Sequence, residues 1–147
     1  QEVILAIKNS EELLQATWKR ENETVAEKIQ EAHFETSILT YNDENALACV
    51  ISLAYYSART YYTEIRELPS GKGFAEIVYR PRKEHLDKPA MIIELKWNKD
   101  AESAINQIKE RNYPHTLKDY QGNLLMVGIN YNPKTKVHEC LIERLAI

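Results

Sequence analysis

A carboxylate and an amine stand two positions apart at the end of an apolar run. Met91-Ile92-Ile93 has the composition of a strand buried on both faces, and Glu94-Leu95-Lys96 follows it directly. Alternate side chains of a strand share a face, so Glu94 and Lys96 point the same way, about 6–7 Å apart. Because an unpaired charge is costly to bury, both groups need partners. The local sequence allows either an ion pair at the strand end or a divalent cation on the carboxylate, with water or phosphate beside the amine.

A second acid, Glu76, lies in the middle of another strand-like segment, from Gly73 to Arg80. A hairpin-like return would set Glu76 beside Glu94, and two carboxylates with one lysine then form a site for a hard cation. Oxygen ligands without a cluster of His or Cys favour Mg²⁺ or Mn²⁺ over Zn²⁺. The alternative for Glu76 is a surface ion pair with Arg80 or Lys72.

The segments that would position these residues alternate between helical and strand-like patterns. The apolar run from Val3 to Ile7 predicts a short strand or the tail of a preceding element. Ser10 is followed by two glutamates, a pattern that predicts the start of a helix. Asn22 predicts the cap of a second helix that runs to about Ser37. The elements predicted after these are a helix from Asn42 or Asp43 to about Thr60, strands at 61–68, 72–80 and 89–96, a helix from Asp100 or Ser103 to about Asn112, a helix near 114–122, and strands at 124–131 and 137–144. This order predicts an α/β domain with a mixed central sheet of about four to five strands flanked by helices, and an N-terminal helical appendage.

Composition excludes several classes of protein. The chain has 147 residues, 44% of them hydrophobic and 28% charged, as is ordinary for one soluble globular domain. No apolar run approaches the roughly 20 residues that cross a bilayer. Cys49 and Cys140 lie among apolar neighbours, so we expect reduced core cysteines and a cytoplasmic protein. Because the chain starts at Gln1 rather than Met, we expect an excised domain or a trimmed chain.

The charge balance does not by itself indicate a nucleic-acid-binding protein. The formal net charge is −3, so an interface with nucleic acid requires a local cluster of basic residues or another domain. Basic side chains gather near two predicted strand ends, where they form either such a cluster or a solubilising rim: Lys72, Arg80, Arg82, Lys83 and Lys88. The histidines lack the spacing of metal ligands and are interpreted as surface or structural residues: His33, His85, His115 and His138.

Four stretches carry a pattern found in a known family. They are 41–45 (YNDEN), 53–59 (LAYYSAR), 66–75 (RELPSGKGFA) and 89–97 (PAMIIELKW). From 41 to the end, the chain resembles the C-terminal nuclease domain of bacterial AAA-ATPase-like proteins, which belongs to the PD-(D/E)XK nuclease superfamily. The resemblance implies a restriction-endonuclease-like core at 41–147, a helical connector at 1–40 and an ATPase domain ahead of it. It implies nucleic acid as the partner, DNA rather than RNA, with no membrane, and it leaves a homo-oligomer open.

The resemblance also implies roles for individual residues. Glu94 would be a metal ligand, and Lys96 would orient the attacking water and stabilise charge on the phosphate. Glu44 would be the acid that the superfamily often places on its first core helix, although a contact with the helix dipole explains it equally from the local sequence. Gln107 and Tyr113 resemble residues that some relatives carry near the substrate or metal; without the resemblance they would be a solvated side chain and a packing residue.

Glu76 departs from the family pattern, because it stands where the family usually has Asp. Its extra methylene displaces the carboxylate by one C–C bond, and Mg²⁺ tolerates misplaced ligands poorly. Two functions follow from this. The first is a Mg²⁺- or Mn²⁺-dependent nuclease acting on DNA, with the metal on Glu44, Glu76 and Glu94. The second is an inactive, nuclease-derived module that binds nucleic acid or regulates its ATPase. A third interpretation, a structural oligomerisation domain, leaves the polar strand end unexplained.

Overall fold

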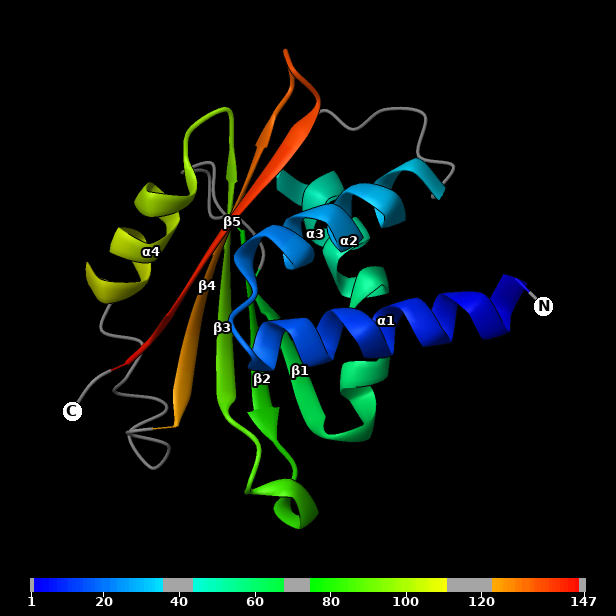
Figure 1. Cartoon of the computed structure of the whole chain (residues 1–147). Coiled ribbons are helices and arrows are strands. Elements are labelled where there is room, and N and C mark those ends of the chain that lie inside the picture. Colours follow the sequence, from blue (N-terminus) through cyan, green and yellow to red (C-terminus); the bar gives the residue numbers. More distant parts are fainter. Residues whose placement is uncertain (1, 36–43, 68–74, 111–122, 146–147) are drawn as a thin grey trace.

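A five-stranded mixed sheet lies between two layers of helices (Figure 1). The computed structural model describes residues 2–35, 44–67, 75–110 and 123–145. The elements along the chain are α1 (Glu2–Trp18), α2 (Asn22–Glu35), α3 (Glu44–Ala54), η1 (Tyr56–Thr60), β1 (Tyr62–Glu67), β2 (Ala75–Pro81), η2 (Lys83–His85), β3 (Ala90–Trp97), α4 (Ala101–Glu110), β4 (Leu124–Asn132) and β5 (Val137–Arg144). The mixed sheet with flanking helices confirms the predicted fold class.

The strands lie in the order β1-β2-β3-β4-β5, so each strand pairs with its neighbours in sequence. Of the described strands, only β3 and β4 pair in parallel; the other pairs are antiparallel. A parallel pair needs a crossover, and α4 lies within the segment that connects β3 to β4. Both strands are buried along almost their whole length because helices cover both faces, which explains their continuous apolar runs.

The two faces of the sheet carry separate hydrophobic cores. On one face α1, α2 and α3 pack over alternate residues of the central strands, among them Ile77, Ile93 and Val127. On the other face Ile105 and Ile108 of α4 pack over the intervening residues, among them Ile92, Leu124 and Met126. Since side chains alternate along a strand, Glu76, Glu94 and Lys96 fall on the α4 face. No helix among the described residues is long and apolar enough to cross a membrane.

The first helix begins earlier than the sequence predicts. α1 runs without interruption from Glu2, so the prediction of a strand at Val3–Ile7 and a helix start at Ser10 is wrong. The Ser10 hydroxyl donates to the carbonyl of Ile7 and forms a hydrogen bond with the hydroxyl of Ser57. Ser10 therefore lies inside a helix, and its side chain joins α1 to η1. The hydroxyl that was expected to cap a helix start forms a hydrogen bond with a residue far away in the sequence instead.

Other boundaries differ in smaller ways. The helix expected to reach Thr60 ends at Ala54 and continues as the 3-10 helix η1, and the loop at 82–88 contains η2. Cys49 is exposed rather than in the core, whereas Cys140 packs against the core that α1, α2 and α3 cover. Several predicted features lie outside the described residues: the end of the second helix beyond Glu35, the start of the third before Glu44, the turn at 69–71 with the strand start at 72, the helix end near 112, and the helix near 114–122. The predicted domain division at residues 40 and 41 stays a prediction.

Side chains of α2 cover the outer edge of β5. Asn22 Oδ1 accepts a hydrogen bond from the backbone N–H of Ile142 at 3.0 Å, and Gln30 Oε1 accepts one from that of His138 at 3.0 Å. Asn22 was expected only as a helix cap. The backbone N–H and C=O groups of an exposed edge strand can pair with a strand of another molecule. The side-chain oxygens of Asn22 and Gln30 occupy two of these N–H groups on β5.

His138 is buried where α2 meets β5. Its Nδ1 lies 2.6 Å from Gln30 Oε1, and since that oxygen only accepts, Nδ1 carries the proton of the neutral ring. The ring also packs against Tyr131 and His33. Burial away from water, and secondarily the neighbouring His33, lower the pKa of His138 from 6.5 to about 3.

We therefore expect the protein to lose stability as the pH falls below 6.5. Between pH 6.5 and 3 the unfolded chain binds a proton at His138 that the folded chain does not bind. The free energy of unfolding should then drop by about 1.4 kcal/mol per pH unit at most. Urea unfolding at pH 7.5, 6.5 and 5.5 measures this slope, which His138→Gln should flatten while lowering stability at every pH. An equal slope in both proteins would contradict the assignment.

Gly128 lets α4 approach the sheet closely. A Cβ atom built on Gly128 would lie 2.6 Å from the backbone oxygen of Ala101, 3.0 Å from Ala104 Cβ and 3.1 Å from Ile105 Cγ1. The first of these is a backbone atom, so no side-chain rotation relieves the contact. The absence of a side chain at Gly128 therefore sets the distance between α4 and β4.

Gly128→Ala should destabilise the protein by about 1–3 kcal/mol, because α4 must move away from β4. Urea unfolding measures this as a lower midpoint. Thr63→Ala is the control, because Thr63 is exposed on β1 and its substitution overpacks nothing. This variant should have nearly the same midpoint as the unsubstituted chain. Equal midpoints for Gly128→Ala and the unsubstituted chain would show that α4 does not depend on this close approach.

Candidate functional site

The two predicted acids lie opposite each other on neighbouring strands. In the antiparallel pairing of β2 and β3, Glu76 is the register partner of Glu94. Directly opposed residues of such a pair have Cβ atoms about 4.5–5.5 Å apart. Glu76 is 4% exposed and Glu94 is 0% exposed. The juxtaposition expected from a hairpin-like return is therefore present. Glu76 is buried rather than at the surface, and Lys72, one partner of the alternative ion pair, lies outside the described residues.

Lys96 lies two residues beyond Glu94 on the same face and is 7% exposed. Its Nζ donates a hydrogen bond to Oε1 of Gln107 at 2.8 Å. Gln107 is half-buried on α4. The structure thus brings together four of the predicted site residues, and α4 fixes the direction of the lysine through its glutamine.

Two carboxylates fix the N-terminus of α4. Asp100 is the N-cap, with Oδ1 accepting the N–H of Ser103 at 2.6 Å, and this hydrogen bond lowers the pKa of Asp100. Glu139, from β5, accepts the N–H of Ala101 at 2.6 Å through Oε1. Both acids lie where the helix dipole favours negative charge. Sequence reasoning missed Glu139, because nothing local to β5 indicates which helix end it reaches.

Asn130 holds the loop that follows β3. It is the register partner of Lys96 on β4 and is buried. Its Oδ1 accepts the N–H of Lys99 at 2.9 Å, and the N–H of Asn98 donates to the carbonyl of Tyr131 at 2.7 Å. These bonds secure the path from β3 into α4. Sequence reasoning also missed this residue, although a single Asn inside an apolar strand is a signal for a structural polar contact.

On the face that carries Glu76, α4 covers strands β1 and β2 less than it covers β3, β4 and β5. α4 packs on β3, β4 and β5. On the same face, Ile65 of β1 is 37% exposed and Arg80 of β2 is exposed. Arg80 has the parity of Glu76 and therefore shares its face. Within the described ranges, the approach to Glu76 is thus more open from the β1–β2 side than from the α4 side.

Glu44 is the first residue of α3, and its side chain lies outside the described part of the structure, as does Tyr113. The direction of α3 is nevertheless clear from its contacts with β1. Ser52 Oγ donates to Glu64, and Arg66 contacts the sulfur of Cys49 at 3.8 Å. α3 therefore runs opposite to β1, and its N-terminus points toward the end of the sheet that holds Glu76.

The residues at this end suit a hard cation. Among described residues no group of three or more His, Cys, Asp or Glu side chains is placed to hold a metal. Glu76 and Glu94 supply two carboxylates from adjacent strands. Mg²⁺ is commonly held by one or two carboxylates, with waters and substrate phosphates completing its shell. The pair therefore fits a cation that a phosphate-containing substrate helps to bind.

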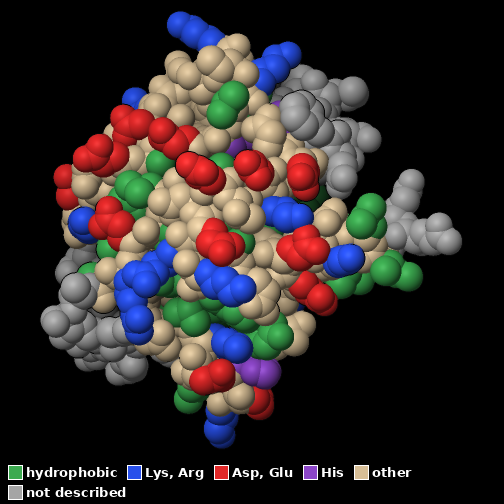
Figure 2. Space-filling view, in the orientation of Figure 1, with side chains coloured by type: hydrophobic (Ala, Val, Ile, Leu, Met, Phe, Trp, Pro, Cys, Tyr) green, Lys and Arg blue, Asp and Glu red, His purple; other side chains and the backbone are tan. Residues whose placement is uncertain are grey.

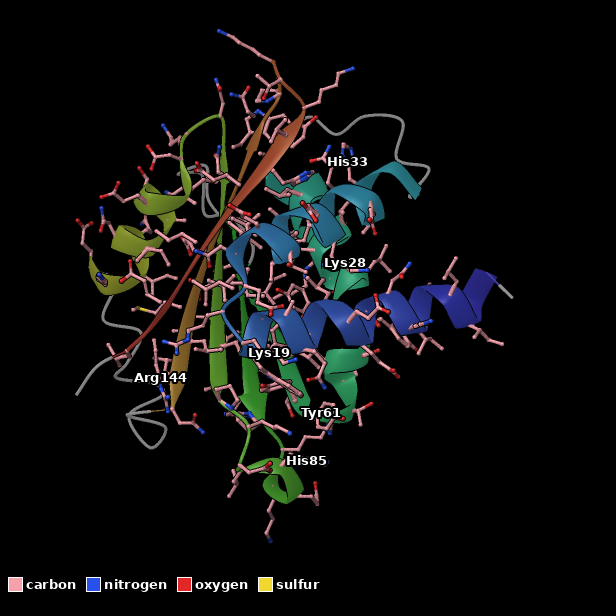
Figure 3. All side chains as sticks on the ribbon, viewed as in Figure 1. Lys19, Lys28, His33, Tyr61, His85 and Arg144 are labelled. Carbon is pink, nitrogen blue, oxygen red and sulfur yellow. The ribbon has the colours of Figure 1, made fainter. Side chains whose placement is uncertain are left out.

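Three of the basic residues predicted to gather at two strand ends lie away from the site. Lys83 and Lys88 lie in the connection from the end of β2 to the start of β3, the opposite end of these strands from Glu76 and Glu94. Lys88 Nζ lies 4.5 Å from the ring centroid of Trp18, in a cation–π contact. Figure 3 shows Tyr61 and His85 at this lower end. Arg82 is there too, and Lys72 is outside the described residues.

Comparison with known proteins tests the identity of the chain. A family model described as the PD-(D/E)XK nuclease superfamily matches residues 42–140, a segment that includes Glu76, Glu94, Lys96 and Gln107. No curated protein matches the chain. The matched segment exceeds half of the sequence and contains β1 to β4 and the start of β5. The chain therefore belongs to the PD-(D/E)XK nuclease superfamily.

Proposed function

We propose that this chain is a metal-dependent nuclease domain that hydrolyses phosphodiester bonds in DNA. The observation that carries the proposal is the buried pair Glu76 and Glu94 on adjacent strands, with Lys96 held beside it by Gln107 at 2.8 Å. Membership of a nuclease superfamily gives nucleic acid as the general substrate. The choice of DNA rests on the resemblance of the sequence motifs.

Each residue has a distinct role in this proposal. Glu76 and Glu94 would hold Mg²⁺ or Mn²⁺, hard cations that prefer oxygen ligands. Such a cation lowers the pKa of bound water and neutralises charge on a phosphate. Lys96 would orient the attacking water and place positive charge beside the phosphate, in a buried site where such charge has most effect. Gln107 is a positioning residue, because its carbonyl oxygen accepts the lysine N–H.

The setting of the domain is a further part of the proposal. The motifs around 41–45 and 66–75 resemble those of nuclease domains that follow an ATPase domain in bacterial AAA-ATPase-like proteins. α1 and α2 would then connect the two. In the described structure these helices pack through Leu13, Leu14 and Ile29 onto the same core as the sheet, so the connection would transmit movement directly to the nuclease core.

A second candidate is an inactive module that binds nucleic acid or regulates the ATPase. The observation in its favour is Glu76, which replaces the usual Asp of the family and carries one more methylene. A misplacement of about 1 Å at a reacting centre costs on the order of 100-fold in rate. The net charge of −3 also suits a regulatory module better than a tight nucleic-acid binder.

We expect Glu94→Gln and Lys96→Met each to reduce cleavage by on the order of 100-fold or more, because each removes charge used at the phosphate. The assay uses plasmid and single-stranded DNA with Mg²⁺, and then with Mn²⁺. Glu102→Gln, on the exposed side of α4, is the matched control and should cleave at the unsubstituted rate. Circular dichroism and urea unfolding establish that each variant folds. Cleavage that persists in folded Glu94→Gln would contradict the site.

Glu76→Asp separates the two candidate functions. If strand β2 is adapted to glutamate, the unsubstituted chain cleaves DNA and the shorter side chain lowers the rate by on the order of 10–100-fold. If glutamate is the lesion, the unsubstituted chain is silent and Glu76→Asp is active. The same plasmid assay, with metal titrated for both proteins, distinguishes these results. Silence of both proteins across the titration favours the binding module.

A further inference from the structure

The β4–β5 hairpin projects at the end of the sheet that holds the site. Glu94 and Lys96 lie toward the C-terminal end of β3, and β4 runs parallel to β3. β4 continues to Asn132, beyond the partner of Trp97, so the hairpin extends past the end of β3 (Figure 1). The turn that closes it carries two lysines, Lys134 and Lys136.

The turn is held in one conformation. Asn132 Oδ1 accepts the backbone N–H of Lys134 at 2.9 Å and that of Thr135 at 3.2 Å. Lys136 has a φ of 61° and donates its N–H to the Asn132 carbonyl at 2.7 Å. Gln30 of α2 donates to the carbonyl of Lys136 at 2.7 Å. The backbone at both lysines is therefore fixed against the body of the domain.

A third lysine, Lys99, lies in the loop at the same end. Its backbone N–H is held by buried Asn130, the neighbour of Lys96 on β4. Its side chain is exposed. We name Lys99, Lys134 and Lys136 the lysine rim. Figure 2 shows Lys and Arg side chains standing out at the top of the molecule, where the hairpin lies in Figure 1.

All three side chains of the lysine rim are exposed, and none forms an ion pair with a described acid. Other lysines differ in this respect. Lys28 lies 2.6 Å from Glu12, and Lys109 lies 3.0 Å from Glu143. The positive charge of the rim is therefore available to a partner, although the chain as a whole is acidic.

We propose that the lysine rim binds the phosphate backbone of the nucleic acid whose scissile bond lies at Glu94 and Lys96. This inference rests on the proposed function. Gly128, the partner of Glu94, and Asn132 are four residues apart on β4. Four residues of strand span about 13 Å. Because phosphates of one strand of duplex DNA are spaced by about 3.4 Å along the axis, the rim lies roughly four base-pair steps from the site.

The basic residues at the other end of the sheet fit this role less well. Lys88 lies before the start of β3 at Ala90, which is four residues, or about 13 Å of strand, from Glu94 in the opposite direction. Its amine already lies over the Trp18 ring, and its neighbour Asp87 is 3.6 Å away. Glu84 follows Lys83 directly. Asp100 likewise follows Lys99, so the contrast between the two ends rests on Lys134 and Lys136, neither of which forms an ion pair with a described acid.

The test measures binding of a fluorescent 30-base-pair DNA duplex in EDTA, where cleavage does not interfere, at several salt concentrations. The rim variant combines Lys134→Gln with Lys136→Asn, since Asn tolerates the positive φ of residue 136. The matched control combines Lys19→Gln with Lys83→Gln, which removes the same charge from exposed positions. Urea unfolding establishes that both variants are folded.

We expect the rim variant to raise the dissociation constant by about tenfold and to reduce the slope of log K against log salt by about 2, because two phosphates are no longer neutralised. The control should match the unsubstituted chain. In the Mg²⁺ or Mn²⁺ assay, the rim variant should raise KM and leave kcat within about twofold. Lys99→Gln should reduce the slope by about 1.

Equal effects of the rim and control variants, or no effect of the rim variant, would overturn the inference, as would absence of DNA binding by the unsubstituted chain. Failure of the proposed function looks different. Rim-dependent binding without cleavage in either metal would support the rim and reject the nuclease. Cleavage with a rim-independent KM would support the nuclease and reject the rim.

Discussion

The burial of two carboxylates side by side, Glu76 and Glu94, is the constraint on which the rest of the structure depends. Like charges at this spacing repel strongly where water is excluded. Two carboxyl groups this close need either a nearby positive charge or a proton held by one of them, and Lys96 lies on the same face of the sheet. The pair and Lys96 therefore give the sheet a polar end outside its two hydrophobic cores.

α4 packs over this polar end on the same face of the sheet. It packs closely on β4 because Gly128, the register partner of Glu94, has no side chain. Asp100 and Glu139 then fix its first turn, and Gln107 meets Lys96 about two turns later. The lysine is thus positioned by a helix that is itself held at one end by hydrogen bonds and along its length by packing. Rigid support of this kind is what a precise catalytic geometry requires.

Much of the fold was predictable from local patterns. All five strands lie within a few residues of their predicted ranges, because period-two alternation, turn residues and buried apolar runs are local signals. The opposition of Glu76 and Glu94 was also predictable, since a short connection makes β2 and β3 antiparallel neighbours. The signals failed where a distant partner replaced a local one. Ser10 binds Ser57 instead of capping a helix. The second helix does begin at Asn22, but the Asn22 side chain binds the edge of β5 instead of capping that helix.

The sequence alone determined which residues share the α4 face of β3, because side-chain alternation along a strand depends only on the backbone. Tertiary structure decided which partners those residues meet. Gln107 reaches Lys96, Glu139 reaches the start of α4, and Asn130 holds the loop after β3. It also separated Lys83 and Lys88 from the site and brought Lys134 to the same end of the sheet. These contacts depend on how closely layers pack and on which strands run parallel, properties of the whole chain that no short segment encodes.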